Sequence, residues 1–121
     1  MKVLVVDDSP IIRKLIRSIL EKKSDEFEIV GEARNGKEAI ELVKSLSPDI
    51  IALDITMPVM GGLDAAEEIK KIAKDSKILL ITSFIDEEGA KKANEMGIRH
   101  ILQKPFSPSS LIETLEKMVG E

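Results

Sequence analysis

Short runs in which every residue is apolar recur along this chain, and they constrain its fold more than any other feature. Three of the runs are unbroken, at residues 3–6, 50–53 and 78–81. Runs that are apolar at every position are typical of strands in a parallel sheet that is covered on both faces. A weaker run at 27–30 is interrupted by Glu28 and predicts an edge strand, and 98–102 predicts a fifth strand.

Patterns typical of amphipathic helices separate these runs. The first has apolar residues along a single face, at Ile11, Ile12, Leu15, Ile16, Ile19 and Leu20. Ser9 and Pro10 predict its start, because serine caps helix N-termini and proline fits the first helical position. Further helices are predicted from Asn35-Gly36, from the region of Leu63 and from Ser107-Pro108, the last with Leu111, Leu115, Met118 and Val119 facing inward. The stretch 87–96 has few large apolar side chains and predicts a thinly packed helix.

Five strands that alternate with five helices through short connections predict an α/β fold. Parallel strands need crossover helices, and right-handed crossovers place these helices on both faces of the sheet. The predicted architecture is therefore a doubly wound, five-stranded parallel sheet. The sequence shows no linker, internal repeat or low-complexity tract, so we expect residues 1–121 to form one domain.

Composition and charge argue against several function classes. Hydrophobic residues make up 43% of the 121 residues and charged residues 33%, which is typical of a folded protein. The net charge of -4 and the aromatic content of only 2% argue against direct nucleic-acid binding. The sequence contains no cysteine, which excludes disulfides and thiolate metal sites. No apolar run approaches the ~20 residues of a membrane helix and no signal peptide precedes the first strand, so we expect a cytoplasmic protein.

Polar residues stand where the predicted strands end. They are Asp7-Asp8, Asp54, Thr82-Ser83 and Lys104. In doubly wound sheets ligands bind beyond the carboxyl ends of the strands, so these side chains are expected to share one edge. Carboxylates about 5 Å apart repel one another by ~3 kcal/mol per pair at an effective dielectric constant of about 20. The three aspartates therefore indicate a bound cation, and oxygen ligands favour a hard ion such as Mg²⁺.

In this order the motifs resemble those of the response regulator receiver domain, in its chemotaxis-type (CheY-like) single-domain form. The motifs are Asp7-Asp8, the segment Asp54-Ile55-Thr56-Met57-Pro58 followed by Gly62, Thr82-Ser83 and Lys104-Pro105-Phe106. Each motif alone is weakly specific, but four in order at the ends of predicted strands form a specific pattern. The resemblance covers essentially the whole chain. It implies the flavodoxin-like strand order 2-1-3-4-5 and a cis bond between Lys104 and Pro105.

For function, the resemblance implies a two-component response regulator receiver rather than an enzyme. A sensor histidine kinase is the implied phosphodonor, and Asp54 is the implied phosphoacceptor. Asp8, Asp54 and the backbone carbonyl of Thr56 would bind Mg²⁺ directly, and Asp7 would bind it through water. Phosphoryl transfer needs mainly positioning and charge neutralisation, so Lys104 is expected to act on the transferring oxygens.

The resemblance also implies a conformational switch. Thr82 is expected to donate its hydroxyl to the phosphoryl group and to draw the following loop inward. That change would bias the helix at 87–96 between two arrangements. The face formed by this helix, the fifth strand and the last helix would then signal to a downstream protein. The receiver is expected to be a monomer or a weak, phosphorylation-dependent dimer that does not bind nucleic acid or membrane.

Several positions depart from the family pattern. Ile101 stands where many members have tyrosine or phenylalanine, so the usual aromatic switch is not assumed. Gly61 stands where aspartate or asparagine is common. Thr56 and Phe84 occupy the two positions that tune phosphoryl lifetime, and Phe84 is expected to hinder an attacking water. His100 is expected to be a surface residue on the signalling face.

Other functions fit parts of the pattern. The chain can be the receiver half of a DNA-binding response regulator without its effector, because residues 30–36 resemble such receivers equally well. A haloacid-dehalogenase-type phosphatase also uses an aspartate nucleophile and Mg²⁺, but it needs a second aspartate where this chain has Thr56. A flavodoxin-like electron carrier needs a phosphate-binding loop after the first strand, where Asp7 and Asp8 would repel a phosphate.

Overall fold

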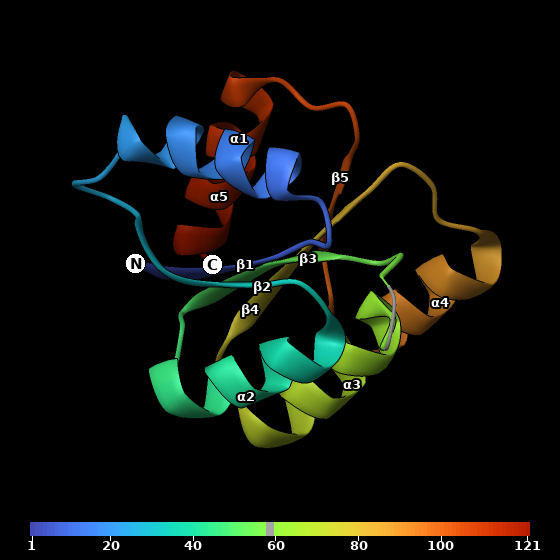
Figure 1. Cartoon of the computed structure of the whole chain (residues 1–121). Coiled ribbons are helices and arrows are strands. Elements are labelled where there is room, and N and C mark those ends of the chain that lie inside the picture. The colour runs from blue at the N-terminus through green and yellow to red at the C-terminus, as the bar shows by residue number, and fades with distance from the viewer. Residues whose placement is uncertain (58–59) are drawn as a thin grey trace.

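A five-stranded parallel sheet forms the centre of the molecule (Figure 1). The computed structural model describes residues 1–57 and 60–121, so Pro58 of the Asp54 motif lies outside the described residues. The strands are β1 (Lys2–Val6), β2 (Glu28–Ala33), β3 (Ile50–Asp54), β4 (Lys77–Thr82) and β5 (His100–Gln103). The helices are α1 (Pro10–Glu21), α2 (Gly36–Leu46), α3 (Gly62–Ile72), α4 (Glu87–Glu95) and α5 (Pro108–Val119). The strand order is β2-β1-β3-β4-β5, which confirms the predicted fold and topology.

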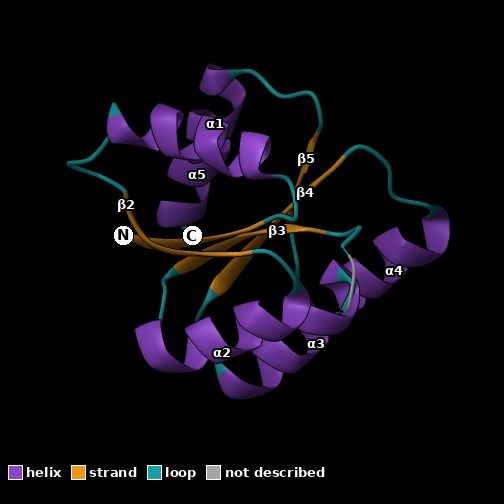
Figure 2. Ribbon diagram, in the orientation of Figure 1, coloured by secondary structure: helices purple, strands orange, loops and turns teal. Residues whose placement is uncertain are grey.

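The helices cover both faces of the sheet and enclose two hydrophobic cores. Figure 2 shows α1 and α5 on one face and α2, α3 and α4 on the other. Successive residues of a strand point to opposite faces, so Val3 and Val5 pack beneath α1 and α5 whereas Leu4 and Val6 pack toward α2 and α3. Both cores draw on β1, β3 and β4, which explains why these strands are apolar at nearly every position.

Helix starts follow the predicted caps. The Ser9 hydroxyl accepts a hydrogen bond from the Ile12 amide at 3.3 Å, and the Asn35 side chain accepts one from the Glu38 amide at 2.9 Å. Ser107 caps α5 in the same way, accepting from the Ser110 amide at 3.0 Å. Each cap satisfies a backbone donor that has no partner within the helix, so the chain leaves the sheet edge and enters the helix at a defined residue.

The second strand differs from its predicted bounds of 27–30. It extends to Ala33, because Gly31, Glu32 and Ala33 pair with the second half of β1 after a shift in register. Phe27 precedes the strand and is buried in the core beneath α1 and α5. The position of β2 at one edge of the sheet confirms the interpretation as an edge strand. At the other edge β5 begins only at His100, since Ile98 packs into the opposite core before the strand starts.

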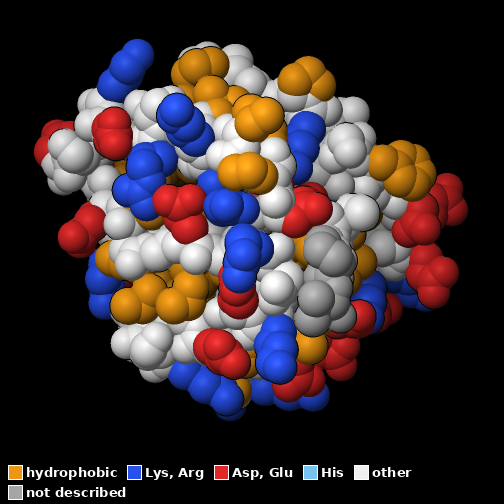
Figure 3. All heavy atoms as spheres, in the orientation of Figure 1, with side chains coloured by type: hydrophobic (Ala, Val, Ile, Leu, Met, Phe, Trp, Pro, Cys, Tyr) orange, Lys and Arg blue, Asp and Glu red, His pale blue; other side chains and the backbone are white. Residues whose placement is uncertain are grey.

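The apolar stripe of α1 is wider than the surface it buries. Ile16, Ile19 and Leu20 are buried, whereas Ile11 is 77% exposed and Leu15 is also exposed. Ile11 and Leu15 lie on the flank of the stripe, away from the buried line of Ile16, Ile19 and Leu20. Figure 3 shows hydrophobic side chains on this face, with basic side chains around them. Val119 was likewise predicted to face inward and is exposed, because it lies beside the buried line of Leu111, Leu115 and Met118 on α5.

The fourth helix is thinly packed, as predicted. Only Gly89 and Ala93 of α4 are buried. Its Lys92 ammonium pairs with two carboxylates of α3, those of Asp64 at 3.5 Å and Glu67 at 3.6 Å. Ion pairs on an exposed surface contribute little stability, so α4 is held less firmly than the other helices. Within the described part of the chain, no helix has the length and apolar character needed to span a membrane.

Candidate functional site

The predicted site residues come together at the carboxyl edge of the sheet. Asp7 and Asp8 follow β1, Asp54 ends β3, Thr82 ends β4 and Lys104 follows β5. Because all the strands are parallel, these ends lie on the same edge. β1 and β3 are neighbours in the middle of the sheet, so the carboxylates at their carboxyl ends lie close together. The fold therefore brings the acidic residues close enough for their short side chains to meet.

The three aspartates form a compact oxygen cluster. One carboxylate oxygen of each of Asp7, Asp8 and Asp54 lies within 4.8 Å of the others. Asp7 is 2% and Asp54 5% exposed, whereas Asp8 is exposed. One oxygen of Asp7 accepts a hydrogen bond from the Ser9 amide at 2.9 Å, so Asp7 is fixed by the same turn that starts α1.

Lys104 is the cation of the site. Its ammonium donates to Oδ2 of Asp7 at 2.8 Å and lies 3.7 Å from Oδ1 of Asp54. The Lys104 amide donates to the Thr82 carbonyl at 2.8 Å, which ties the loop after β5 to the end of β4. The bond between Lys104 and Pro105 is cis, as the family resemblance implied. The half-buried Lys104 ammonium therefore lies near two of the three carboxylates, those of Asp7 and Asp54.

The environment of Asp54 disfavours its charged form. Burial raises the pKa of Asp54, and the neighbouring carboxylates of Asp7 and, to a smaller extent, Asp8 raise it further. The Lys104 ammonium and the Thr56 amide, whose nitrogen lies 3.4 Å from Oδ1, act in the opposite direction. The net pKa lies above the ordinary aspartate value, so this cluster favours binding of positive charge.

Thr82 is buried beside the cluster but is engaged within its own loop. Its hydroxyl donates to the Phe84 carbonyl at 2.9 Å and accepts from the Phe84 amide at 3.3 Å. The predicted contact of this hydroxyl with a phosphoryl group remains a prediction. Phe84 itself is 74% exposed, and Ile101 on β5 is 41% exposed.

Arg13 is a contributor that the sequence analysis missed. Its guanidinium donates to the backbone carbonyl of Asp7 at 2.6 Å, and its Nε lies 3.2 Å from the carboxylate of Glu32. Arg17 pairs with the same carboxylate. These contacts connect α1, β2 and the acidic loop, and they join residues that are 6 to 19 positions apart. The only sequence signal is a pair of arginines on the polar side of a helix that follows the Asp7-Asp8 motif.

His100 has a specific partner rather than a free surface position. Its ring nitrogen Nε2 lies 2.8 Å from Oε2 of Glu121, and its side chain is only 19% exposed. It stands at the start of β5, far along the strand from Lys104. His100 therefore takes no part in the acidic cluster.

The acidic cluster is able to hold a metal ion. Its ligands are all oxygens, they lie close together, and two of the three carboxylates are buried where their repulsion is poorly screened. A hard cation bound by oxygen ligands relieves this repulsion. The residues therefore fit the metal site that the sequence indicated.

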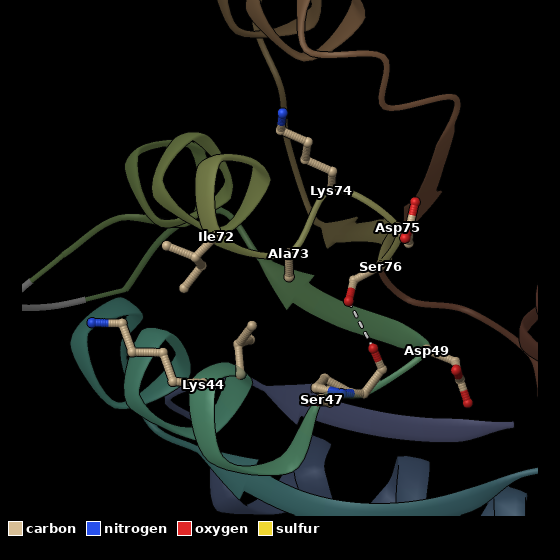
Figure 4. Close-up of a pocket in the computed structure, with 10 residues that line it drawn as sticks. Lys44, Ser47, Asp49, Ile72, Ala73, Lys74, Asp75 and Ser76 are labelled. Carbon is tan, nitrogen blue, oxygen red and sulfur yellow. Dashed lines mark hydrogen bonds between the residues drawn. The ribbon is translucent and has the colours of Figure 1, made fainter.

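A different hollow, of about 380 Å³, lies at the opposite end of the sheet (Figure 4). It is formed where α2 and α3 end and where β3 and β4 begin. The hydroxyl of Ser76 donates to the Pro48 carbonyl at 2.7 Å, and the Asp49 carboxylate accepts from the Lys2 amide at 2.7 Å. These polar groups have backbone partners and serve the turns. We assign no chemistry to this hollow.

Comparisons with known proteins decide the family. Residues 3–116 match the response regulator receiver domain. The chain belongs to this family. The receiver is 40% identical to the chemotaxis protein CheY of Thermotoga maritima, over 97% of this chain and 96% of that protein. It is 41% identical to the chemotaxis protein CheY of Halobacterium salinarum, over 98% of this chain and 96% of that protein.

Solved structures agree with this assignment. The receiver is similar to the crystal structure of the CheX-CheY-BeF3-Mg²⁺ complex from Borrelia burgdorferi, with a TM-score of 0.90 and 28% identity, covering 98% of this chain and 89% of that one. The family, the relatives and the acidic cluster together show that the chain is a CheY-like, two-component response regulator receiver. The receiver family is a family of signalling domains.

Proposed function

We propose that the receiver accepts a phosphoryl group on Asp54 from a sensor histidine kinase, with Mg²⁺ bound at the acidic cluster. The observation that carries the proposal is the convergence of three aspartate oxygens and the Lys104 ammonium at the end of the central strand β3. An oxygen of Asp54 forms the new bond to phosphorus. The bond from phosphorus to the donor breaks, and its electron pair leaves with the donor.

The assignment of Asp54 as nucleophile follows from the partners of each carboxylate. Asp7 is occupied on both oxygens, by the Ser9 amide and by Lys104. Asp8 is exposed at the rim. Asp54 is buried at the end of β3, where its Oδ1 has only a long contact of 3.4 Å with the Thr56 amide and the Lys104 ammonium at 3.7 Å. Asp54 is thus the buried carboxylate with the weaker hydrogen bonds, and we assign it as the nucleophile.

The residues present also account for the charge that accumulates during transfer. Asp8, Asp54 and the Thr56 carbonyl would hold Mg²⁺ directly and Asp7 would hold it through water, and the bound ion would supply positive charge next to the transferring oxygens. Lys104 contacts Asp7 and lies near Asp54, so the same ammonium reaches oxygens added to Asp54 through a small side-chain rotation. Neither role requires a general base.

The response to phosphorylation begins at Thr82. For its hydroxyl to donate to the phosphoryl group, its hydrogen bond to the Phe84 carbonyl must break, which frees the loop that leads into α4. Because α4 buries only Gly89 and Ala93, a small change in this loop suffices to shift its position. The face formed by α4, β5 and α5, with the exposed Ile101 on it, then contacts a downstream protein.

Phosphorylation is testable with a small phosphodonor. When the protein is incubated with acetyl phosphate and Mg²⁺, intact-mass spectrometry is expected to show a gain of one phosphoryl group. The reaction is expected to stop when the metal is removed with EDTA, because the carboxylates then repel the donor. Absence of any adduct with metal present, in a protein whose circular dichroism shows it folded, would contradict the proposal.

Metal binding has a thermal signature of its own. Mg²⁺ at about 100 times its dissociation constant should stabilise the folded protein by ~2.7 kcal/mol, because binding to the folded state alone shifts the equilibrium. Asp8→Asn should raise the metal-free melting temperature and remove most of the response to Mg²⁺. Asp75→Asn, which alters an exposed aspartate outside the cluster, serves as the control. An unchanged Mg²⁺ response in Asp8→Asn argues against the cluster as the metal site.

Phe84 is expected to prolong the phosphorylated state. An aromatic ring at the mouth of the site obstructs the water that hydrolyses the acyl phosphate, whereas a carboxylate there attracts and orients water. Phe84→Glu should therefore speed the loss of phosphate about tenfold, which corresponds to ~1.4 kcal/mol of barrier. A phosphate-release time course measures this rate. Ile72→Glu makes the same change at an exposed position on α3, and equal decay rates in the two variants would reject the role of Phe84.

A further inference from the structure

Basic side chains surround a small hollow at the end of the sheet opposite Asp54. The hollow has a volume of about 270 Å³. Its basic lining residues are Lys70 near the end of α3, Lys77 at the start of β4, and Arg99 and His100 where β5 begins. Ile78 and Met118 provide apolar walls. None of these residues takes part in the phosphorylation chemistry proposed above, because the strands separate the two ends of the sheet.

A carboxylate of the chain itself is bound in this hollow. The side chain of Glu121 contacts Nε2 of His100 through both oxygens, at 2.9 and 2.8 Å. The Lys77 ammonium donates to the backbone oxygens of Met118 and Glu121. The hydrogen bond from His100 lowers the pKa of Glu121, and the charges of Arg99 and Lys77 lower it further. The hollow therefore stabilises the anionic form of a carboxylate.

The contacts of Glu121 and Met118 leave two of the four basic side chains of the hollow, Lys70 and Arg99, without a partner in the described part of the chain. Among the described residues, neither Lys70 nor Arg99 has an ion-pair partner. The protein as a whole has a net charge of -4, whereas four basic side chains and one acidic side chain line this hollow, so it is a local region of positive charge. An exposed guanidinium and an ammonium beside a bound carboxylate attract a second anionic group.

We propose that this basic hollow binds a small polyanion with phosphoryl or carboxylate groups, and that Glu121 is an internal ligand that the polyanion displaces. The volume lies just below the range of about 300 to about 1,000 Å³ typical of sites for drug-sized ligands, which favours a small ligand. The fork of the Arg99 guanidinium suits phosphate and carboxylate oxygens, and Lys70 provides a second charge from the facing helix. His100 is released from Glu121 to donate to the same ligand.

The test is a titration of the whole chain with two probes at constant ionic strength and without added divalent metal, since both probes chelate metal. One arm uses pyrophosphate and the other citrate, and nuclear magnetic resonance follows the His100 ring and the Glu121 amide. We expect saturable shifts with a dissociation constant on the order of 1 mM. Saturation in the pyrophosphate arm alone assigns phosphoryl groups to the ligand, saturation in the citrate arm alone assigns carboxylates, and saturation in both supports either source.

Matched variants decide whether the hollow is the site. Lys70→Gln and Arg99→Gln should each weaken binding about fivefold. Lys71→Gln makes the same charge change one position along α3, where the side chain pairs with Glu68 at 3.3 Å and does not line the hollow, and should leave binding unchanged. Glu121→Gln should strengthen binding about threefold, because it removes the charged competitor. Shifts that stay linear with both probes, or equal weakening in Lys71→Gln and Lys70→Gln, overturn the proposal.

Discussion

Replacing Asp54 with asparagine is expected to abolish the phosphoryl adduct and, at the same time, to stabilise the metal-free protein. Asparagine has nearly the same shape as aspartate but cannot attack phosphorus as a carboxylate does. It also removes a buried charge that Asp7 and Asp8 repel, so the free energy of unfolding should rise by about 1 kcal/mol. Intact-mass spectrometry measures the first effect and urea denaturation the second.

The stabilising effect should depend on pH in a defined direction. Because the pKa of Asp54 is raised above its ordinary value of 3.8, the folded protein binds this proton more readily than the unfolded chain does. The wild type should therefore gain stability relative to Asp54→Asn as the pH falls through the raised pKa, with no further gain below the ordinary value. The carboxylates of Glu38 and Glu121, whose pKa is lowered, act in the opposite sense, but both proteins contain them and their effects cancel in this difference.

Asp75→Asn is the control for both effects, since it makes the same chemical change at an exposed position. It should leave both the adduct and the free energy of unfolding unchanged. An adduct of full stoichiometry in Asp54→Asn would place the phosphoacceptor elsewhere. A variant less stable than the wild type at neutral pH would mean that the charge of Asp54 is well compensated without a metal.

Alanine at position 62 is expected to destabilise the fold severely, whereas alanine at position 61 is not. A Cβ atom on Gly62 would lie 2.0 Å from the carbonyl oxygen of Asp54 and 2.7 Å from Cα of Ile55. These are backbone atoms of the site and cannot turn aside as a flexible side chain does. The Gly62 amide also donates to the Ile55 carbonyl at 2.7 Å, which holds the two segments together.

The expected loss in Gly62→Ala is about 3 kcal/mol or more, the upper part of the range for overpacking. Gly61 precedes α3 with a φ of -67, and the nearest atom to its Cβ would be the Ile55 carbonyl oxygen at 3.4 Å. Gly61→Ala should therefore change stability by less than ~1 kcal/mol. Urea denaturation of the two variants measures the contrast, and equal stabilities would show that the backbone of Asp54 and Ile55 moves aside to admit the Cβ atom.

Much of the fold could be predicted because its signals are local. The unbroken runs at 50–53 and 78–81 report burial on two faces, and Ser9, Asn35 and Ser107 mark helix starts through bonds to residues three positions away. The bounds of β2 could not be predicted in the same way. Residues 31–33 lie at a sheet edge, where Gly31 and Glu32 are half-buried and show no apolar run, and their strand structure comes from pairing with β1.

The sequence predicted which side chains gather at this edge of the sheet, but it did not predict the contacts between them. Parallel strands bring Asp7, Asp54 and Lys104 to one edge, so their positions after strands were sufficient. That Lys104 binds Asp7 more closely than Asp54 depends on side-chain packing across 97 residues of sequence. Arg13 donates to the Asp7 carbonyl and pairs with Glu32. Neither contact corresponds to a periodic pattern in the sequence, so neither could be predicted from it.

The sequence by itself determined the order of strands and helices, the starts of the capped helices and the presence of three carboxylates and one ammonium at strand ends. Tertiary structure alone decided which oxygens are occupied, how far Asp54 is buried, which side chains of α1 remain exposed, and that Glu121 reaches His100. The physical reason is the distance along the sequence over which each interaction acts. Periodicity and capping act over a few residues, whereas burial and electrostatics depend on all the groups that folding brings within a few ångströms.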